Sequence, residues 1–265
     1  TDSEPREWVT YDHRPRFGSN YVGLRNRFSV LSEAYSCIDL PARITATRGF
    51  ILEVLTSAVK HRAQIVALTA QADARARNGG LSFGYDTQLG PTTREIFLLG
   101  AVVDQVLPDG LGMRHVAVSE VQATMMHVRR GFHSDARFEL PKAWLLPQPT
   151  QLMRELLGLH GILCEETTEE QQLDVEVFLP TEVRREEDLF QGHHELSLVG
   201  AWQIQTHTLP VGALRIPAQQ PLARLAAQLL EPQSEDSAST WDKLIGWETA
   251  SACDGSSIPV WRLPN

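Results

Sequence analysis

The stretch that decides the first part of the fold runs from residue 28 to residue 80 and reads FSVLSEAYSCIDLPARITATRGFILEVLTSAVKHRAQIVALTAQADARARNGG. Residues 28–33, with Phe28, Val30 and Leu31, predict a short strand that ends on an acid. Apolar residues then recur at helical spacing over residues 41–76, with basic residues on the other side, which predicts a long helix. Because Asn78, Gly79 and Gly80 end that helix, the stretch predicts one strand–loop–helix unit of an α/β sheet.

Beyond this stretch the pattern changes to short strands separated by proline and glycine. Residues 173–179 alternate apolar and polar side chains with period two and form the clearest predicted strand. Two helices are predicted, at 150–160 with Gly161 as the C-cap, and at 221–230 with a proline in the first turn. Further strands are predicted at residues 96–103, 114–118, 143–146, 196–204 and 211–216. We therefore place a boundary near residue 80, with domains at 1–80 and 81–265, the second being mixed α+β and strand-rich.

The composition excludes several classes of partner. The chain has 265 residues and a formal net charge of -9, and a surface of that sign repels nucleic-acid phosphates. No apolar run approaches the roughly 20 residues that a membrane span requires. The three cysteines, Cys37, Cys164 and Cys253, are far apart and form no metal-binding pair. We expect no nucleic acid and no membrane span, and we leave a homo-oligomer open.

The segment of residues 14–35 gathers the groups that suit chemistry. Arginine, asparagine and tyrosine side chains crowd the loop that leads into the predicted strand ending at Glu33. In open α/β sheets ligands bind outside the carboxyl ends of the strands, and a partly desolvated carboxylate there suits a general base. The competing interpretation is that Glu33 caps the next element or forms a surface ion pair.

Two sets of residues resemble zinc carboxypeptidases of a bacterial subgroup that has a C-terminal accessory domain. The first is residues 20–35, NYVGLRNRFSVLSEAY; the second comprises residues 190–193, 218–232 and 258–263. The resemblance implies that residues 1–80 are the tail end of a zinc carboxypeptidase-like α/β sheet domain and that residues 81–265 are the accessory domain. It also implies a peptide substrate. Members of this family are often exported or periplasmic, and the sequence leaves the compartment open.

By the same resemblance, Glu33 matches the glutamate that moves the proton of a zinc-activated water to the leaving amine. The family's substrate-contacting tyrosine corresponds to Tyr21 or Tyr11, and the sequence does not choose between them. Arg25 and Asn26, beside Tyr21, are the candidate substrate-binding residues.

The zinc ligands are where this sequence departs from the family. None of the nine histidines is followed three residues later by glutamate, so the His-x-x-Glu pair is absent and no residue here is assigned to metal. The resemblance places those ligands upstream of Glu33. We therefore expect a truncated chain that binds no zinc and hydrolyses no peptide alone, although the intact protein would use zinc. The alternative is a non-catalytic module that binds a peptide, a glycan or a protein.

Overall fold

The structure is a computed structural model that describes residues 7–34, 36, 38–91, 94–108, 112–241, 243–244 and 257–265. Tyr35, Cys37 and Cys253 lie outside these residues. The described chain is a mixture of helix and sheet, as the sequence predicts at that coarse level. It divides into two compact units, and each unit combines segments from both sides of residue 80. Unit 1 comprises residues 1–12, 30–66 and 88–133, and unit 2 comprises residues 13–29, 67–87 and 134–265.

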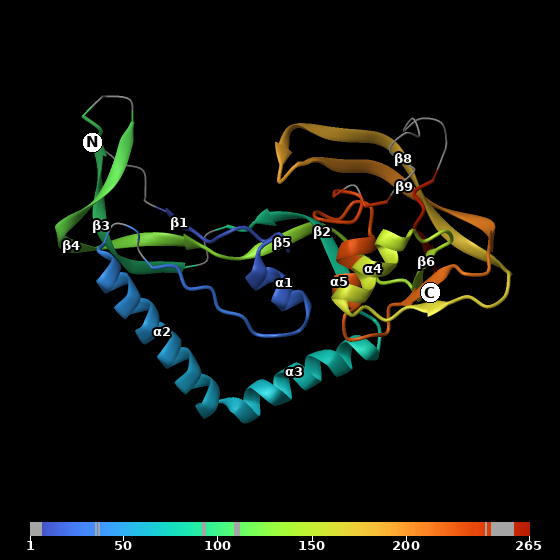
Figure 1. The fold of residues 1–265 in the computed structure, drawn as a ribbon, viewed down its shortest axis with the longest axis horizontal. Helices are drawn as coiled ribbons and strands as arrows, with labels where there is room; N and C mark the ends of the chain where they lie inside the picture. The colour runs from blue at the N-terminus through green and yellow to red at the C-terminus, as the bar shows by residue number, and fades with distance from the viewer. Residues whose placement is uncertain are drawn as a thin grey trace. The chain divides into compact units, whose positions relative to one another are not determined.

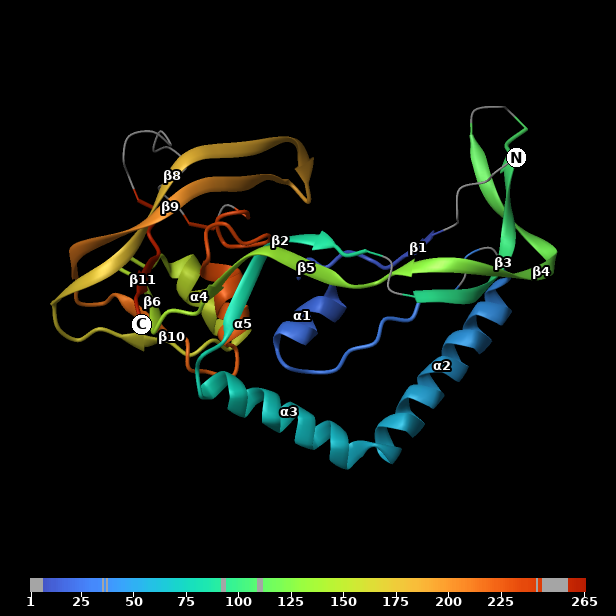
Figure 2. The same cartoon turned by 180° about the vertical axis from the view of Figure 1, so that it is seen from behind.

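Unit 1 is built from three paired strands and a long helix. The strands β1 (Glu7–Val9), β3 (Arg94–Val106) and β4 (Met113–Arg129) form a sheet in the order β1-β4-β3. β3 and β4 form an antiparallel hairpin, whereas β1 pairs with β4 in parallel (Figure 2). The predicted strands at 96–103 and 114–118 are therefore confirmed, and both are longer than the sequence pattern indicated.

The predicted long helix is confirmed as two successive helices, α2 (Leu40–Lys60) and α3 (Arg62–Arg77). The Asp39 carboxylate caps the start of α2 by accepting from the Ala42 amide at 2.7 Å. The helices are interrupted at His61, and Gly79 and Gly80 follow α3 with φ of +77° and +67°, a left-handed conformation that ends a helix. No side chain of α2 is buried, so its predicted apolar side is exposed.

The predicted strand at residues 28–33 is wrong. These residues are coil, and their apolar side chains face solvent, with Phe28 60%, Val30 61% and Leu31 61% exposed. The apolar composition favoured a strand, but a strand also requires a neighbour for its backbone groups, and no strand in the described part of the chain pairs with this segment. Glu33 consequently does not end a sheet strand. The preceding segment was predicted to be irregular, yet it contains the short helix α1 (Gly18–Leu24).

Unit 2 contains the larger sheet, which has six strands in the order β7-β10-β6-β11-β8-β9, with every pair antiparallel. The predicted strands at 143–146, 173–179, 196–204 and 211–216 are confirmed within it. The strand predicted at 211–216 begins three residues later than predicted, at Leu214. A two-stranded sheet pairs β2 (Ser82–Leu89) with β5 (Phe132–Glu139). The six strands are β6 (Ala143–Leu146), β7 (Glu165–Glu166), β8 (Gln171–Phe190), β9 (His193–Leu209), β10 (Leu214–Pro217) and β11 (Trp261–Leu263).

Two helices cover one face of this six-stranded sheet, as Figure 1 shows. They are α4 (Gln151–His160) and α5 (Ala223–Leu230), both predicted. The Thr150 hydroxyl caps α4 by accepting from the Met153 amide, and Gly161 ends it with φ +72°. Side chains alternate across the sheet, so Trp144 faces the helices while Leu145 belongs to a smaller apolar cluster on the other face.

An ion pair is buried in this core between the sheet and the helices. Arg262 in β11 donates from Nε to Glu231 Oε1 at 3.0 Å, and a second nitrogen contacts Oε2. The Trp144 indole donates to the same carboxylate at 2.6 Å. The guanidinium carbon lies 4.1 Å from the ring centre of Phe138 and 3.9 Å from that of Trp202. Burial raises the pKa of Glu231, although Arg262 and Trp144 act in the opposite direction.

Candidate functional site

Two of the predicted site residues, Tyr21 and Arg25, meet in unit 2 at the end of α4. The Arg25 guanidinium donates to the Tyr21 hydroxyl at 3.1 Å and to the His160 carbonyl at 2.7 Å. The Tyr21 hydroxyl lies 2.9 Å from His160 Nδ1. Because arginine can only donate, the Tyr21 oxygen accepts from Arg25, and the Tyr21 hydroxyl shares a second hydrogen bond with His160 Nδ1. Both residues therefore join α1 to α4, 139 positions away in sequence.

The third, Asn26, has a left-handed backbone with φ +58° and donates its side-chain amide to two acceptors. These are the Pro221 carbonyl at 2.8 Å and the Asp73 carboxylate at 3.1 Å. Arg27 binds the same carboxylate through two nitrogens, at 2.9 and 3.0 Å. The hydrogen bond from Arg27 holds the pKa of Asp73 below its ordinary value. Asn26 thus helps attach the loop after α1 to α3 and to the start of α5.

Glu33 and Tyr11 both belong to unit 1, and both are exposed. The Glu33 carboxylate is in solvent-accessible coil, so it is neither desolvated nor an N-cap of α2, whose cap is Asp39. The structure therefore brings Tyr21, Arg25 and Asn26 into one unit, while the predicted general base and the alternative tyrosine belong to the other.

Unit 2 also contains a cavity of about 490 Å³ next to Tyr21. Aromatic and aliphatic side chains from four parts of the chain line it, including Phe17 before α1, Leu156 in α4, Phe190 at the end of β8 and Leu225 in α5. Trp241 closes the apolar lining. A concave, mostly apolar site of this volume is typical of small-molecule binding.

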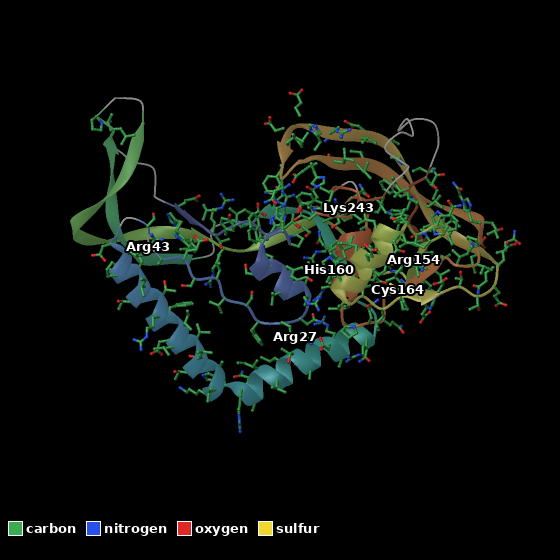
Figure 3. All side chains as sticks on the ribbon, viewed as in Figure 1. Arg27, Arg43, Arg154, His160, Cys164 and Lys243 are labelled. Atoms are coloured by element: carbon green, nitrogen blue, oxygen red, sulfur yellow. The ribbon has the colours of Figure 1, made fainter. Side chains whose placement is uncertain are left out.

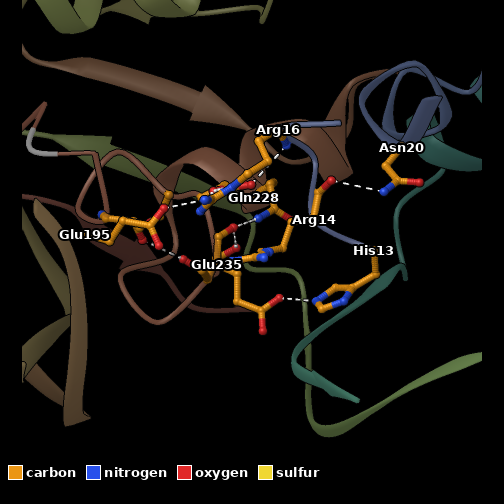
Figure 4. A network of polar contacts seen from close by, with 11 residues as sticks. His13, Arg14, Arg16, Asn20, Glu195, Gln228 and Glu235 are labelled. Carbon is orange, nitrogen blue, oxygen red and sulfur yellow. Dashed lines mark hydrogen bonds and ion pairs between the residues drawn. The ribbon is translucent and has the colours of Figure 1, made fainter. Parts of the chain in front are cut away.

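One wall of the cavity is fixed by Arg16. Its guanidinium carbon lies 4.8 Å from the ring centres of both Phe190 and Trp241. Its Nε donates to Asp236 Oδ1 at 2.7 Å and its backbone amide donates to Oδ2 at 3.0 Å. A further nitrogen contacts Glu195, as Figure 4 shows. Burial acts to lower the pKa of Arg16, but the hydrogen bonds that it donates to these carboxylates, together with their charges, raise it. Arg16 is thus a permanently charged group that is already neutralised.

His160 contributes a polar edge to the same cavity and lies at the C-terminal end of α4 (Figure 3). Burial lowers the pKa of its imidazole, and the positive charge of Arg25 lowers it further. The ring is therefore neutral at pH 7. In the tautomer in which Nδ1 accepts from Tyr21, the ring proton is on Nε2 and that nitrogen is a hydrogen-bond donor.

Several of these cavity residues were not singled out from the sequence. His160 is the last residue of the helix predicted at 150–160, and the sequence analysis does not single out Trp241. No local pattern connects either of them with Tyr21 or Arg16, because the contacts span more than 100 residues. His193 also lines the cavity, where its ring packs edge-on against Trp241 at 6.1 Å.

Neither a metal nor a membrane site emerges from the described residues. Among the residues whose side chains the structure describes, which leaves out 94–105 and 113–126, no group of three or more His, Cys, Asp or Glu side chains could hold a metal ion. The side chains described here therefore do not fit the zinc that the resemblance implies. Among the same residues, no helix combines the length and the apolar character needed to cross a bilayer.

Comparison with known proteins leaves the chain without an assigned relative. No family model matches it, and neither a curated protein nor a solved structure resembles it significantly.

Proposed function

We propose that this chain is part of a zinc metallocarboxypeptidase-like hydrolase that removes C-terminal residues from peptides, with Glu33 as the general base. The proposal rests on the residues that resemble this family, and one structural observation supports it. Segments from both sets of resembling residues, far apart in sequence, line the same cavity in unit 2. Tyr21 comes from the first set, and Phe190, His193 and Leu225 come from the second.

The zinc of such a hydrolase would be held by residues other than those described here, because the described side chains do not form a metal site. Glu33 itself suits proton transfer in one respect, since its carboxylate is exposed and open to water and substrate. Tyr21, Arg25 and Asn26 would act indirectly, because their hydrogen bonds fix α1 and its loop in place.

The test uses the protein expressed from its complete gene, with the zinc content and the hydrolysis of benzoylglycyl-phenylalanine both measured. We expect Glu33→Gln to lower kcat/KM by roughly 10² to 10⁴-fold, the usual contribution of a general base, with zinc content unchanged. Glu53→Gln, a matched change of an exposed carboxylate in α2, should leave the rate unaltered. A complete protein without zinc, or equal rates for the two variants, would refute the proposal.

A second candidate function is a non-catalytic binding module, and the cavity in unit 2 is the observation that favours it. The cavity has the volume of a small-molecule site and is formed entirely within one compact unit. In this function Glu33 has no role. Binding of a small ligand to the chain in the absence of zinc and of hydrolysis would support it.

A further inference from the structure

We propose that the unit 2 cavity binds a carboxylate attached to an apolar body, with Lys243 as the positive partner and His160 as a second hydrogen-bond donor. This inference rests on the second candidate function and names the ligand class. It does not require Glu33 or zinc.

The charge of the cavity wall favours an anion. Asp236 is the single acid among the described residues that line the cavity, and Arg16 occupies both of its carboxylate oxygens. Arg16 is in turn held by Glu195 and by two aromatic rings, so it cannot turn toward a ligand without losing these contacts. The charges of Arg16 and Asp236 on this wall are therefore neutralised by ion pairs.

Lys243 is the remaining charged group of the lining. Its ammonium forms no ion pair with any acid in the described part of the chain, and its backbone amide donates to the Ala238 carbonyl at 2.8 Å. That backbone bond holds the main chain at Lys243, whose side chain lines the cavity. A lysine beside an apolar cavity offers one compact positive charge with three donors.

His160 adds a donor without adding charge. The Tyr21 hydroxyl occupies its Nδ1, and when that hydroxyl donates, the ring proton is on Nε2, the nitrogen left for a ligand. The nearby Arg25 charge disfavours a second proton on the ring. A group that accepts hydrogen bonds and carries one negative charge thus fits this edge better than a cation or a neutral donor.

The remaining lining defines the other half of the ligand. Phe17, Leu156, Leu225 and Leu229 offer apolar contacts and no charge. Removing an apolar body from water into such a cavity is favourable in proportion to the area buried. A doubly charged phosphate would face one unpaired lysine and a largely apolar wall, so a monoanionic carboxylate is the better match. It could belong to a free organic acid or to the C-terminus of a peptide.

The experiment measures binding to the chain by isothermal titration calorimetry at pH 7, using benzoylglycine and its neutral amide as probes. We expect the acid to bind at least ten-fold more tightly than the amide. Lys243→Met should reduce the affinity for the acid to that for the amide, whereas Lys60→Met, an exposed lysine at the end of α2, should not. Lys243→Arg should retain most of the affinity, which separates loss of charge from loss of folding.

A second pair of probes, acetyl-Ala-Ala-Phe as acid and as amide, separates the two sources of the carboxylate. Tighter binding of the peptide acid than of benzoylglycine assigns the site to peptide C-termini, and the reverse assigns it to small acids. Equal affinity for acid and amide, or an unchanged affinity in Lys243→Met, overturns the proposed ligand class while leaving a binding module in place. If none of the four probes binds, both the ligand class and the binding module fail. The peptidase proposal is tested separately by Glu33→Gln.

Discussion

Replacing Arg262 with methionine removes the only positive charge that contacts the buried carboxylate of Glu231 among the described residues. Methionine can still pack between Phe138 and Trp202, so the main loss is the charge and its hydrogen bonds. Glu231 is 2% exposed and, among the described side chains, would keep only the Trp144 indole as a donor, at 2.6 Å. Breaking a buried pair in this way leaves an uncompensated charge and costs about 3–5 kcal/mol at pH 7.

Urea unfolding followed by tryptophan fluorescence measures this cost. With an m value of about 2 kcal/mol per molar urea, the loss corresponds to a fall of roughly 2 M in the unfolding midpoint. Arg184→Met is the matched control, because Arg184 also pairs with a glutamate through Nε, at 2.7 Å, but on an exposed strand. We expect no measurable change in that variant.

Acid should restore part of the lost stability. Burial raises the pKa of Glu231 in the folded state above its ordinary value of 4.5. At pH values between 4.5 and this raised pKa, the folded state therefore binds more protons than the unfolded state. The free energy of unfolding therefore falls as pH rises through this window, by up to about 1.4 kcal/mol per pH unit. Removing Arg262 raises the pKa of Glu231 in the folded state further and so widens the pH range over which stability depends on pH.

The double variant Glu231→Gln with Arg262→Met measures how much of the loss comes from the unpaired charge on Glu231. Glutamine remains an acceptor for the Trp144 indole, so most of the lost stability should return and the pH dependence should disappear. The reasoning is refuted if Arg262→Met costs less than about 1 kcal/mol, or if the glutamine fails to rescue it.

Three further predictions concern the fold. Gly200→Ala should destabilise the protein by about 1–3 kcal/mol, because the new methyl group would meet the Leu179 carbonyl oxygen across the β8–β9 pair; chemical denaturation checks this. Thr150→Ala should cost about 1 kcal/mol through loss of the bond to the Met153 amide, and Thr150→Ser should restore the thermal midpoint. Residues 28–34 should exchange amide hydrogens far faster than the strands of the six-stranded sheet, and equal protection of the two in a monomer would contradict the coil described here.

Local patterns predicted most of the regular elements. The helices before Gly79 and Gly161 both end where the sequence predicts. Each is followed by a glycine in the left-handed conformation, a signal that depends only on residues next to it in sequence. The strand at 171–190 has alternating side chains over residues 173–179, and the structure confirms it. The apolar run at 28–33 failed because its composition could not show whether a neighbouring strand exists.

The candidate site depended more on tertiary structure. The sequence singled out Tyr21 and Arg25 because polar groups crowd one loop, but it gave no reason to pair them with His160. It also could not place Arg16 between Phe190 and Trp241, since these residues are separated by more than 170 positions. Which charges are neutralised, and which lysine remains available, follows only from those long-range contacts.

The sequence by itself determined the helices other than α1, most of the strands, the acidic charge and the resemblance that singles out Glu33. Tertiary structure alone decided that the six strands assemble in the order β7-β10-β6-β11-β8-β9 and that α1, α4, α5 and the end of β8 enclose one cavity. The physical reason is range. Backbone propensity and capping act over a few neighbouring residues, whereas sheet order, burial of an ion pair and the lining of a cavity depend on side chains that only folding brings together.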